Sequence, residues 1–334
     1  MTNTIKKYAV IGLMGVLSFS IPSYAAIDAT AANQVQNMPI EQQLAYIAQN
    51  KNETIEKRAE ALRQLAQYPN QNSLVAVARA LKEPSPVLRQ AAITGANLYK
   101  FEHRWRLLAP LLNDPELSVR RAATVNLLRN YSAMSTDQKH KMEASYQNLV
   151  AYLQHQPEQQ LLMADAYRWH GDWKKADVIY QQLVIRDPQN SQIWLNLSDN
   201  YRAQDQDEEA LVVLNKATKQ LSKDASLYYA KALTQVRLKQ KKSAAESMTI
   251  ATSLANNNSY YWYLNGVLHQ DIDVTVAIAS FEKAYLISGA PEQLYALCDI
   301  YIRHGNEKAN ACIVELAKVA PKSVIEELNK RRNL

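Results

Sequence analysis

The chain has 334 residues, and its hydrophobic content of 47% is typical of a folded protein and excludes a disordered one. Only 7 glycines occur along the whole length, which favours an all-helical fold because long runs free of glycine and proline show helical spacing. The formal net charge of +6 is too mild to identify a partner, and no cluster of basic and aromatic residues indicates nucleic acid binding.

The first 25 residues differ in pattern from the rest of the chain. Lys6 and Lys7 form a short positive region, residues 8–19 form an apolar run, and residues 23–25 (Ser-Tyr-Ala) end in a small-x-small site. This order predicts a cleavable signal peptide over residues 1–25 and export to the periplasm. A retained N-terminal anchor is the alternative. Since no later segment approaches about 18 uninterrupted apolar residues, we expect no stable membrane insertion after cleavage.

A repeat of 31 residues follows the N-terminal segment. The stretch EPSPVLRQAA at residues 83–92 returns as DPELSVRRAA at residues 114–123, and Arg58 stands in register with Arg89 and Arg120 in a third copy that lacks the proline. An acid and a proline suit the first turn of a helix, and the alanines allow close packing. Residues 55–131 resemble short HEAT-like repeats, and residues 26–54 are expected to supply an N-terminal segment and a capping helix.

A second repeat begins near residue 158. Small residues, aromatic residues, a turn glycine and a closing proline recur at fixed offsets in the first unit: Ala164, Tyr167, Gly171, Ala176, Tyr180 and Pro188. The next unit repeats the pattern after 34 residues, with Asp205 in place of the turn glycine. Residues 158–321 therefore resemble about five tetratricopeptide (TPR) repeats. We expect a bridging helix over residues 132–157, beginning near Ser135, and a C-terminal capping helix or tail over residues 322–334.

Together the two resemblances imply an all-α protein, a right-handed α-α superhelix of HEAT-like and TPR helix pairs. No Gly/Ser-rich spacer separates the arrays, so we expect one continuous solenoid. The TPR resemblance also implies a concave surface that binds protein or peptide partners. Its candidate residues are Asp165, Arg168, Trp169, Asp199, Arg202, Arg237, Trp262, His269, Tyr295 and Arg303.

Three of these residues, Arg168, Arg202 and Arg237, recur at equivalent positions. A row of guanidinium groups on one face of a superhelix can grip carboxylates or an extended peptide. Asp165 and Asp199 each stand three residues before an arginine on the same predicted helix, so simple intrahelical pairing is the alternative. The aromatic candidates likewise have core packing as their alternative.

The sequence contains no motif for catalysis. Its 6 histidines include no pair with the spacing of a zinc hydrolase, and no Cys-x-x-Cys, phosphate-binding glycine loop or nucleophile elbow occurs. His170 and His304 precede turn glycines and are expected to be exposed. The prediction is a non-enzymatic scaffold without cofactor or metal, serving assembly of a cell-envelope apparatus. The alternatives are an accessory factor for envelope polysaccharide export or peptidoglycan assembly, and an enzyme with a diffuse site.

The only 2 cysteines, Cys298 and Cys312, fall in the last TPR unit on either side of Gly305. If the unit folds as a helix pair, antiparallel packing brings them near each other, and an oxidising compartment favours a disulfide. The alternative is two buried free thiols that act as small apolar residues.

Overall fold

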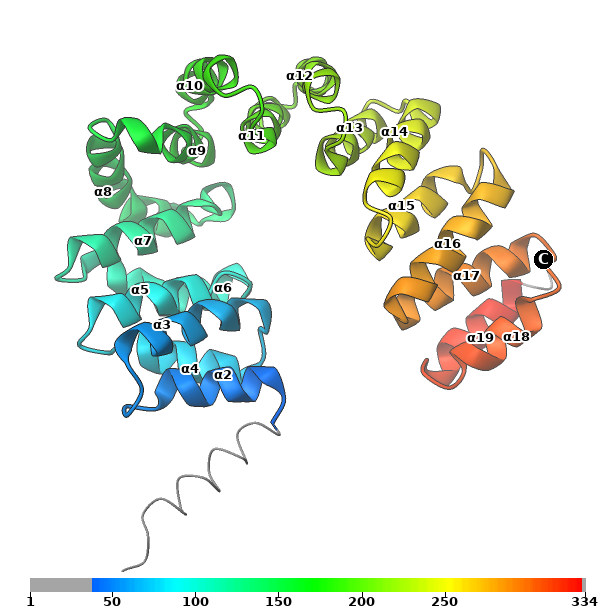
Figure 1. Cartoon of the computed structure of the whole chain (residues 1–334), viewed down its shortest axis with the longest axis horizontal. Coiled ribbons are helices and arrows are strands. Elements are labelled where there is room, and N and C mark those ends of the chain that lie inside the picture. The colour runs from blue at the N-terminus through cyan, green and yellow to red at the C-terminus, as the bar shows by residue number, and fades with distance from the viewer. Residues whose placement is uncertain (1–37, 332–334) are drawn as a thin grey trace, which may run out of the picture. The chain divides into compact units, whose positions relative to one another are not determined.

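The computed structural model describes residues 38–331, and within that range the chain forms 18 α-helices, four short 3-10 helices and no strand (Figure 1). The all-α class predicted from the sequence is therefore confirmed. The predicted signal peptide over residues 1–25 lies outside the described residues. The chain divides into two compact units, with the boundary between Ala123 and Thr124.

The first unit, described from residue 38, consists of short helices joined by tight turns. Its helices are α2 (Ile40–Gln49), α3 (Ile55–Gln64), η1 (Leu65–Gln67), α4 (Gln71–Ala80), α5 (Pro86–Gly95), α6 (Phe101–Leu108), η2 (Ala109–Asn113) and the first part of α7 (Leu117–Leu128). The N-cap side chains of Thr54 and Asn70 accept backbone N–H bonds at the starts of α3 and α4. α3 packs on α2 and α5, and Gly95 permits the approach to α5 because a Cβ there would lie 2.6 Å from the Leu62 carbonyl oxygen.

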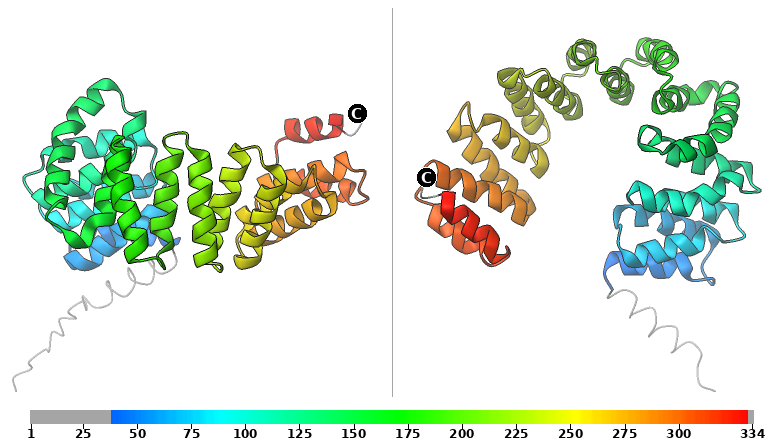
Figure 2. Two further views of the ribbon diagram at one scale, coloured as in Figure 1. Left: turned by 90° about the horizontal axis from the view of Figure 1, so that it is seen from above. Right: turned by 180° about the vertical axis from the view of Figure 1, so that it is seen from behind.

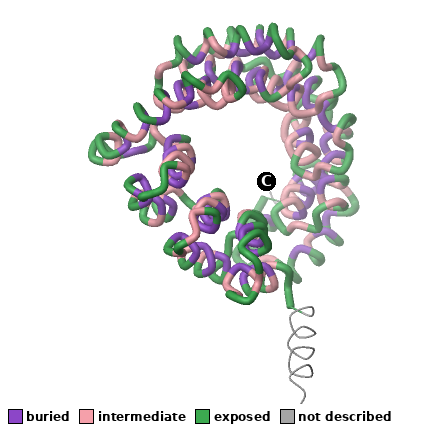
Figure 3. The backbone as a smooth tube through the Cα atoms, turned by 60° about the vertical axis from the view of Figure 1, so that its left-hand side comes forward, coloured by how far each residue is buried: buried purple, intermediate pink, exposed green. Residues whose placement is uncertain are grey.

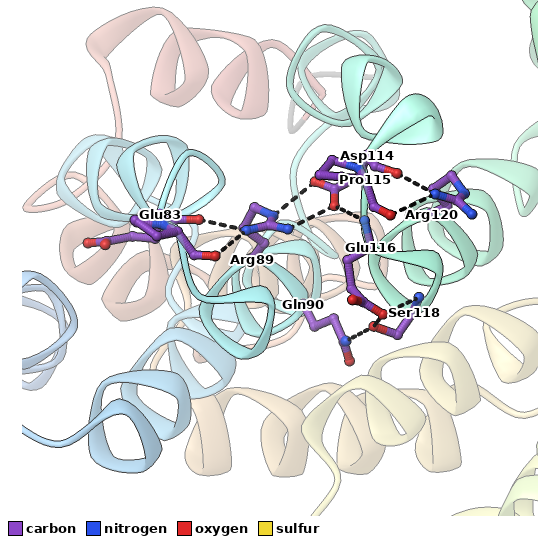
Figure 4. A network of polar contacts seen from close by, with 9 residues as sticks. Glu83, Arg89, Gln90, Asp114, Pro115, Glu116, Ser118 and Arg120 are labelled. Atoms are coloured by element: carbon purple, nitrogen blue, oxygen red, sulfur yellow. Dashed lines mark hydrogen bonds and ion pairs between the residues drawn. The ribbon is translucent and has the colours of Figure 1, made fainter.

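The arginines of the 31-residue repeat hold this unit together (Figure 4). Arg89 donates to both carboxylate oxygens of Asp114 at 2.9 and 2.8 Å and to two carbonyls of the loop that precedes its own helix. Arg58 donates a single bond to Glu83 at 2.5 Å, again 25 residues ahead, and another to the Ala48 carbonyl of α2. Arg120 donates to the Asp114 carbonyl. Although burial opposes ionisation, the bonds from Arg89 hold the pKa of Asp114 below its usual value.

This network gives the recurrence of the sequence signature a structural cause. Arg58 and Arg89 each bind the acid that begins the next repeat, so the acid and the arginine must return at one spacing. Both guanidinium groups are buried, and a buried arginine must be paired. The finer assignment of these repeats to the HEAT-like class stays a prediction, as do the domain boundaries.

The second unit begins with the rest of α7 and with α8 (Thr136–Leu153), where Ser135 forms the capping box expected of a helix start. Helix pairs follow: α9 (Gln160–His170) with α10 (Trp173–Arg186), α11 (Ser191–Arg202) with α12 (Asp207–Gln220), α13 (Ala225–Arg237) with α14 (Lys241–Leu254), α15 (Ser259–His269) with α16 (Val274–Ser288), and α17 (Pro291–Arg303) with α18 (Ala309–Leu316). Short 3-10 helices η3 (Tyr131–Ala133) and η4 (Pro157–Gln159) flank α8, and α19 (Lys322–Arg331) ends the described chain.

Consecutive helices from α8 to α18 pack against each other, and α9 to α14 lie side by side in Figure 2. Buried and exposed residues alternate around the helical turns in Figure 3, as expected where each helix buries the sides that face its neighbours. This arrangement is a helical-repeat solenoid. The right-handed sense of the superhelix stays a prediction.

The turns inside the first three pairs share one backbone conformation. Gly171 has φ 101°, and the residues 34 and 68 positions later, Asp205 and Lys239, have φ 57° and 59°. Glycine adopts this left-handed region freely, whereas other residues do so at a cost of about 1 kcal/mol or more. The repeat therefore imposes its turn geometry even where the glycine that favours it is missing.

The last pair and α19 share a core that contains a disulfide. Cys298 on α17 and Cys312 on α18 are joined with an S–S distance of 2.01 Å and a Cα–Cα distance of 5.4 Å. Both cysteines are buried in the same cluster as Leu328 of α19. Arg331 of α19 also pairs with Asp299 of α17 at 2.9 Å, so α19 is fastened to the last pair at two points.

Candidate functional site

The ten residues predicted for the binding surface all lie on the first helices of the five pairs: α9, α11, α13, α15 and α17. The structure brings some of them together in one groove and commits others to contacts within the protein. That they contact a partner stays a prediction.

A groove of about 500 Å³ runs over α11, α13 and α15, the first helices of three successive pairs. Leu195 of α11 and Leu233 of α13 contribute its apolar lining, together with Ala230. The predicted residues Asp199, Arg202 and Arg237 line the same groove. Gln192, Ser198 and Ser226 also line the groove, so it offers both apolar and polar contacts to a ligand.

Both groove arginines already have a carboxylate partner. Arg202 donates from Nε to Asp199 at 3.0 Å, and both side chains are more than two-fifths exposed. Arg237 donates from Nε to Asp207, in the first turn of α12, at 2.7 Å and from Nη2 to Thr234 at 3.0 Å. A guanidinium carries five N–H donors, so each arginine has donors beyond those bonded to its own carboxylate. Because the carboxylates offset the two positive charges, the groove does not select for an acidic ligand by charge alone.

Two tyrosines form the aromatic part of the groove. The rings of Tyr229 on α13 and Tyr261 on α15 stack with centroids 4.8 Å apart and an interplanar angle of 15°. The exposed Tyr260 meets Tyr229 edge to face at 6.4 Å. Burial raises the pKa of Tyr229 and of Tyr261, so both hydroxyls stay protonated at neutral pH and can donate to a ligand.

Sequence reasoning did not include Tyr229, Tyr261, Leu195 or Leu233 among the candidate residues, and all four line the groove. The available signal was their position: Tyr229 and Tyr261 occupy corresponding places near the start of successive first helices. Predicting the concave face from one helix at a time selects its charged residues. The groove lies between helices, so its lining also includes apolar and aromatic residues that face the neighbouring helix.

Arg168 differs from the other two arginines. It donates from Nε to the Tyr180 hydroxyl at 3.2 Å and lies 3.4 Å from Asp165, and both members of the pair are only 14% exposed. Asp165 also accepts bonds from Tyr180 of α10 and, at 2.8 Å, from Asn196 of α11. Burial raises the pKa of Asp165 against the effect of these donors. Arg168 therefore fits the alternative of a structural pair with Asp165. The network of this pair joins α9, α10 and α11.

The two tryptophans lie outside the groove. Arg129 and Arg168 sit over the Trp169 ring, 5.3 and 5.8 Å from its centroid, which fits cation–π contact. Trp262 donates from its indole nitrogen to the Asn256 carbonyl at 2.9 Å. Both side chains are partly buried, so each combines packing with a polar contact.

The remaining candidates are also held by local contacts. His269 lies 3.1 Å from the Thr249 hydroxyl, and Arg303 pairs with Asp299 at 2.9 Å. Tyr295 packs against the core cluster of the last pair. These three residues are not part of the groove on α11, α13 and α15.

One expectation from the sequence needs correction. His170 was expected to be exposed, but its side chain is 18% exposed because it lies between two tyrosine rings. Gly266 lies on the same helix as Trp262 and His269, but it is buried against Phe281 of the paired helix, where a Cβ would lie 2.8 Å from the ring. His304 is exposed as expected.

Residues 38–331 contain neither a metal-binding cluster nor a membrane-spanning helix. No group of three or more His, Cys, Asp or Glu residues in that range could hold a metal ion. No helix in the same range has the length and apolar character needed to cross a membrane.

A family model described as tetratricopeptide repeat matches residues 169–234, from the end of α9 into α13. The structure of a MamA protein is 20% identical and covers 52% of this chain and 92% of its own, with a TM-score of 0.41. The structure of YrrB, titled a TPR protein with an unusual peptide-binding site, is 16% identical and covers 55% and 97%, with a TM-score of 0.43.

The pilF protein of Pseudomonas aeruginosa is 15% identical and covers 63% of this chain and 96% of its own, with a TM-score of 0.42. No curated protein matches the sequence. The family match and the paired helices together describe a helical-repeat solenoid that contains tetratricopeptide repeats.

Proposed function

We propose that the protein is a non-enzymatic scaffold that binds a protein or peptide partner in the groove over α11, α13 and α15. The observation that carries this proposal is the groove itself, which combines an apolar lining, stacked tyrosines and two arginines along three successive repeats. The family match overlaps two of these three helices. A volume of about 500 Å³ accommodates a few residues of a partner chain.

The lining specifies how such a segment would bind. One apolar or aromatic side chain of the partner packs between Leu195, Leu233 and the face of Tyr229, where its area is removed from water. A carbonyl or carboxylate beside that side chain accepts bonds from Arg202 or Arg237. The apolar contact supplies most of the affinity, because exposed, already paired arginines gain little from a further charge.

We propose further that the protein works in the periplasm, in the assembly of a cell-envelope apparatus. The signal pattern over residues 1–25 supports export, and the disulfide between Cys298 and Cys312 fits an oxidising compartment. Cell fractionation with N-terminal sequencing tests this location. A mature chain that begins at Ala26 in the periplasmic fraction is expected, and an intact N-terminus in the cytoplasm contradicts the proposal.

Site-specific photocrosslinking tests the groove. A photoreactive residue at Leu233 is expected to capture a discrete partner in cells, whereas the same residue at Leu286, which is 77% exposed on α16, is not. Mass spectrometry of the adduct identifies the partner and its contact peptide. Equal capture at both positions would contradict a groove-specific partner.

Binding of the identified peptide to the full mature chain then measures each contribution. Tyr229→Ala is expected to weaken binding by roughly tenfold or more, and the double variant R202A/R237A by a smaller factor. The matched control K174A/K216A removes two positive charges from exposed positions on α10 and α12 and is expected to bind normally. Normal binding by Tyr229→Ala would exclude the groove. Retention of the protein on isolated cell wall, without a protein partner, would favour the polysaccharide alternative.

A further inference from the structure

His170, the last residue of α9, is enclosed by two tyrosine rings. Tyr146 of α8 stacks on the imidazole with centroids 3.7 Å apart and an interplanar angle of 8°. Tyr131 of η3 covers it at 4.5 Å with a tilt of 38°. Through its two ring faces, the imidazole of α9 therefore contacts both α8 and η3. It lies where α8 packs against the first helix pair.

Both ring nitrogens of His170 face a carboxylate. Nε2 lies 3.1 Å from Glu143 of α8, and Nδ1 lies 3.4 Å from Asp172, which directly precedes α10. Asp172 also accepts a bond from the Tyr146 hydroxyl at 2.6 Å. Glu143 accepts a further bond from Gln147 at 2.8 Å. Oxygen atoms therefore surround the edge of the imidazole on both sides.

This arrangement is complementary to imidazolium rather than to neutral imidazole. A neutral ring has one N–H and can donate to one carboxylate, which leaves a lone pair directed at the other. A protonated ring donates a charge-assisted bond from Nε2 to Glu143 and also places its positive charge within ion-pair distance of Asp172. The electron-rich faces of two tyrosines also favour a cation between them.

The other charged groups around the ring do not reverse this preference. Lys139 of α8 lies over the ring of Tyr131, with its Nζ 5.4 Å from the ring centroid. The exposed Lys175 of α10 lies 3.7 Å from Asp172. The bond from Gln147, together with that from His170, holds the pKa of Glu143 below its usual value, so this carboxylate stays ionised near neutral pH.

The tyrosines do not titrate near neutral pH either. Burial raises the pKa of Tyr131 and of Tyr146, so both rings remain neutral. Histidine is the side chain whose charge ordinarily changes between about pH 5 and 8.

We propose that His170 is a pH-responsive lock that fastens α8 to the first TPR helix pair. Protonation closes the lock through the bond from Nε2 to Glu143 on α8 and the ion pair with Asp172 before α10, and loss of the proton removes the attraction to both carboxylates. The apolar side of α8, including Met142, Leu149 and Leu153, stays packed in both states. The lock therefore regulates how often α8 opens locally and does not decide whether the protein folds. It acts independently of the groove, so its failure would leave the proposed function unaffected.

Hydrogen exchange of the full mature chain at pH 5.5 and pH 8.0 tests the lock, after correction for the intrinsic dependence of exchange on pH. We expect the opening equilibrium of α8 to increase by about three- to tenfold at pH 8.0, a range set by the partial exposure of both carboxylates. Helix α14, distant in sequence, serves as an internal reference and is expected to stay constant.

Variants separate this lock from a general effect of pH. His170→Gln keeps a polar side chain that cannot be protonated, and its α8 is expected to open equally at both pH values. The matched control H140Q removes an exposed histidine of the same helix and is expected to keep the wild-type response. Glu143→Gln, at a side chain that is 45% exposed, leaves the fold intact and is expected to reduce the response. Constant α8 opening in the wild type, or an unchanged response in His170→Gln or Glu143→Gln, would overturn the proposal.

Discussion

Two Asp-Arg pairs with the same spacing allow a direct measurement of what burial does to an ion pair. Asp165–Arg168 on α9 and Asp199–Arg202 on α11 are both three residues apart on first helices, and they are 34 residues apart in the repeat. The first pair is 14% exposed at both side chains, whereas the second is 42% exposed at the acid and 49% at the arginine. We predict that a double-mutant cycle with alanine gives a favourable coupling free energy only for the first pair.

The magnitudes follow from the contacts. Arg168→Ala leaves Asp165 buried with Tyr180 and Asn196 as its remaining donors, so the loss is partial, and we expect unfolding to become easier by about 2 kcal/mol. The Asp165–Arg168 coupling should then reach about 1–2 kcal/mol. The exposed pair is screened by water and salt, so its coupling should stay below about 0.5 kcal/mol.

Urea unfolding of the wild type, the single variants and the double variants, followed by far-UV circular dichroism, gives both coupling energies. Hydrogen exchange of α9 and α11 provides a local check, since each repeat contributes its own stability. Equal coupling in the two pairs would refute the argument that burial and the third-helix contact from Asn196 distinguish them. A larger coupling for Asp199–Arg202 would refute it more strongly.

Three further predictions address other contacts. Alkylation of the unreduced protein followed by mass spectrometry should label neither Cys298 nor Cys312, and C298A/C312A should lower the free energy of unfolding by up to about 3 kcal/mol, whereas two labelled thiols would contradict the disulfide. Gly95→Ala should lower the urea midpoint by the equivalent of about 1–3 kcal/mol, because the new Cβ meets the backbone of Leu62, and an unchanged midpoint would contradict this packing. Burial raises the pKa of Asp165, so the stability that this carboxyl contributes is complete below its unfolded pKa of about 3.9 and is lost as pH rises through its folded pKa. Asp165→Asn should remove this loss from the pH dependence of the urea midpoint. An identical pH dependence in the wild type and the variant would contradict the prediction.

Much of the fold could be predicted because its signals are local. The helix start at Ser135 and the turn at Gly171 depend on residues within a few positions of each other, and sequence reasoning identified both. The 34-residue period then predicted the corresponding turn at Asp205, although an aspartate alone does not predict a left-handed backbone conformation. The same period gives Lys239 the same conformation.

The site could be predicted only in part, because its decisive contacts come from neighbouring helices. The repeat register identified Arg202 and Arg237 as residues of one surface, and both line the groove. It could not foresee that Tyr180 would bind Arg168 from the paired helix or that His170 would be enclosed by Tyr146. Such contacts depend on how helices pack, which a periodic pattern on one helix does not contain.

Once the contacts are known, the 34-residue register explains why the same Asp-Arg spacing gives a buried pair on α9 and an exposed pair on α11. Asp165 is held by Tyr180 and Asn196, and the residues 34 positions after these two are Leu214 and Ala230. Neither leucine nor alanine has a side chain that can donate a hydrogen bond, so the next pair cannot be drawn into an equivalent buried network. Asp199 and Arg202 stay at the surface instead, and the small Ala230 leaves the space that becomes part of the groove. Alanine at position 230 therefore both leaves Asp199 without a donor equivalent to Asn196 and forms part of the groove lining.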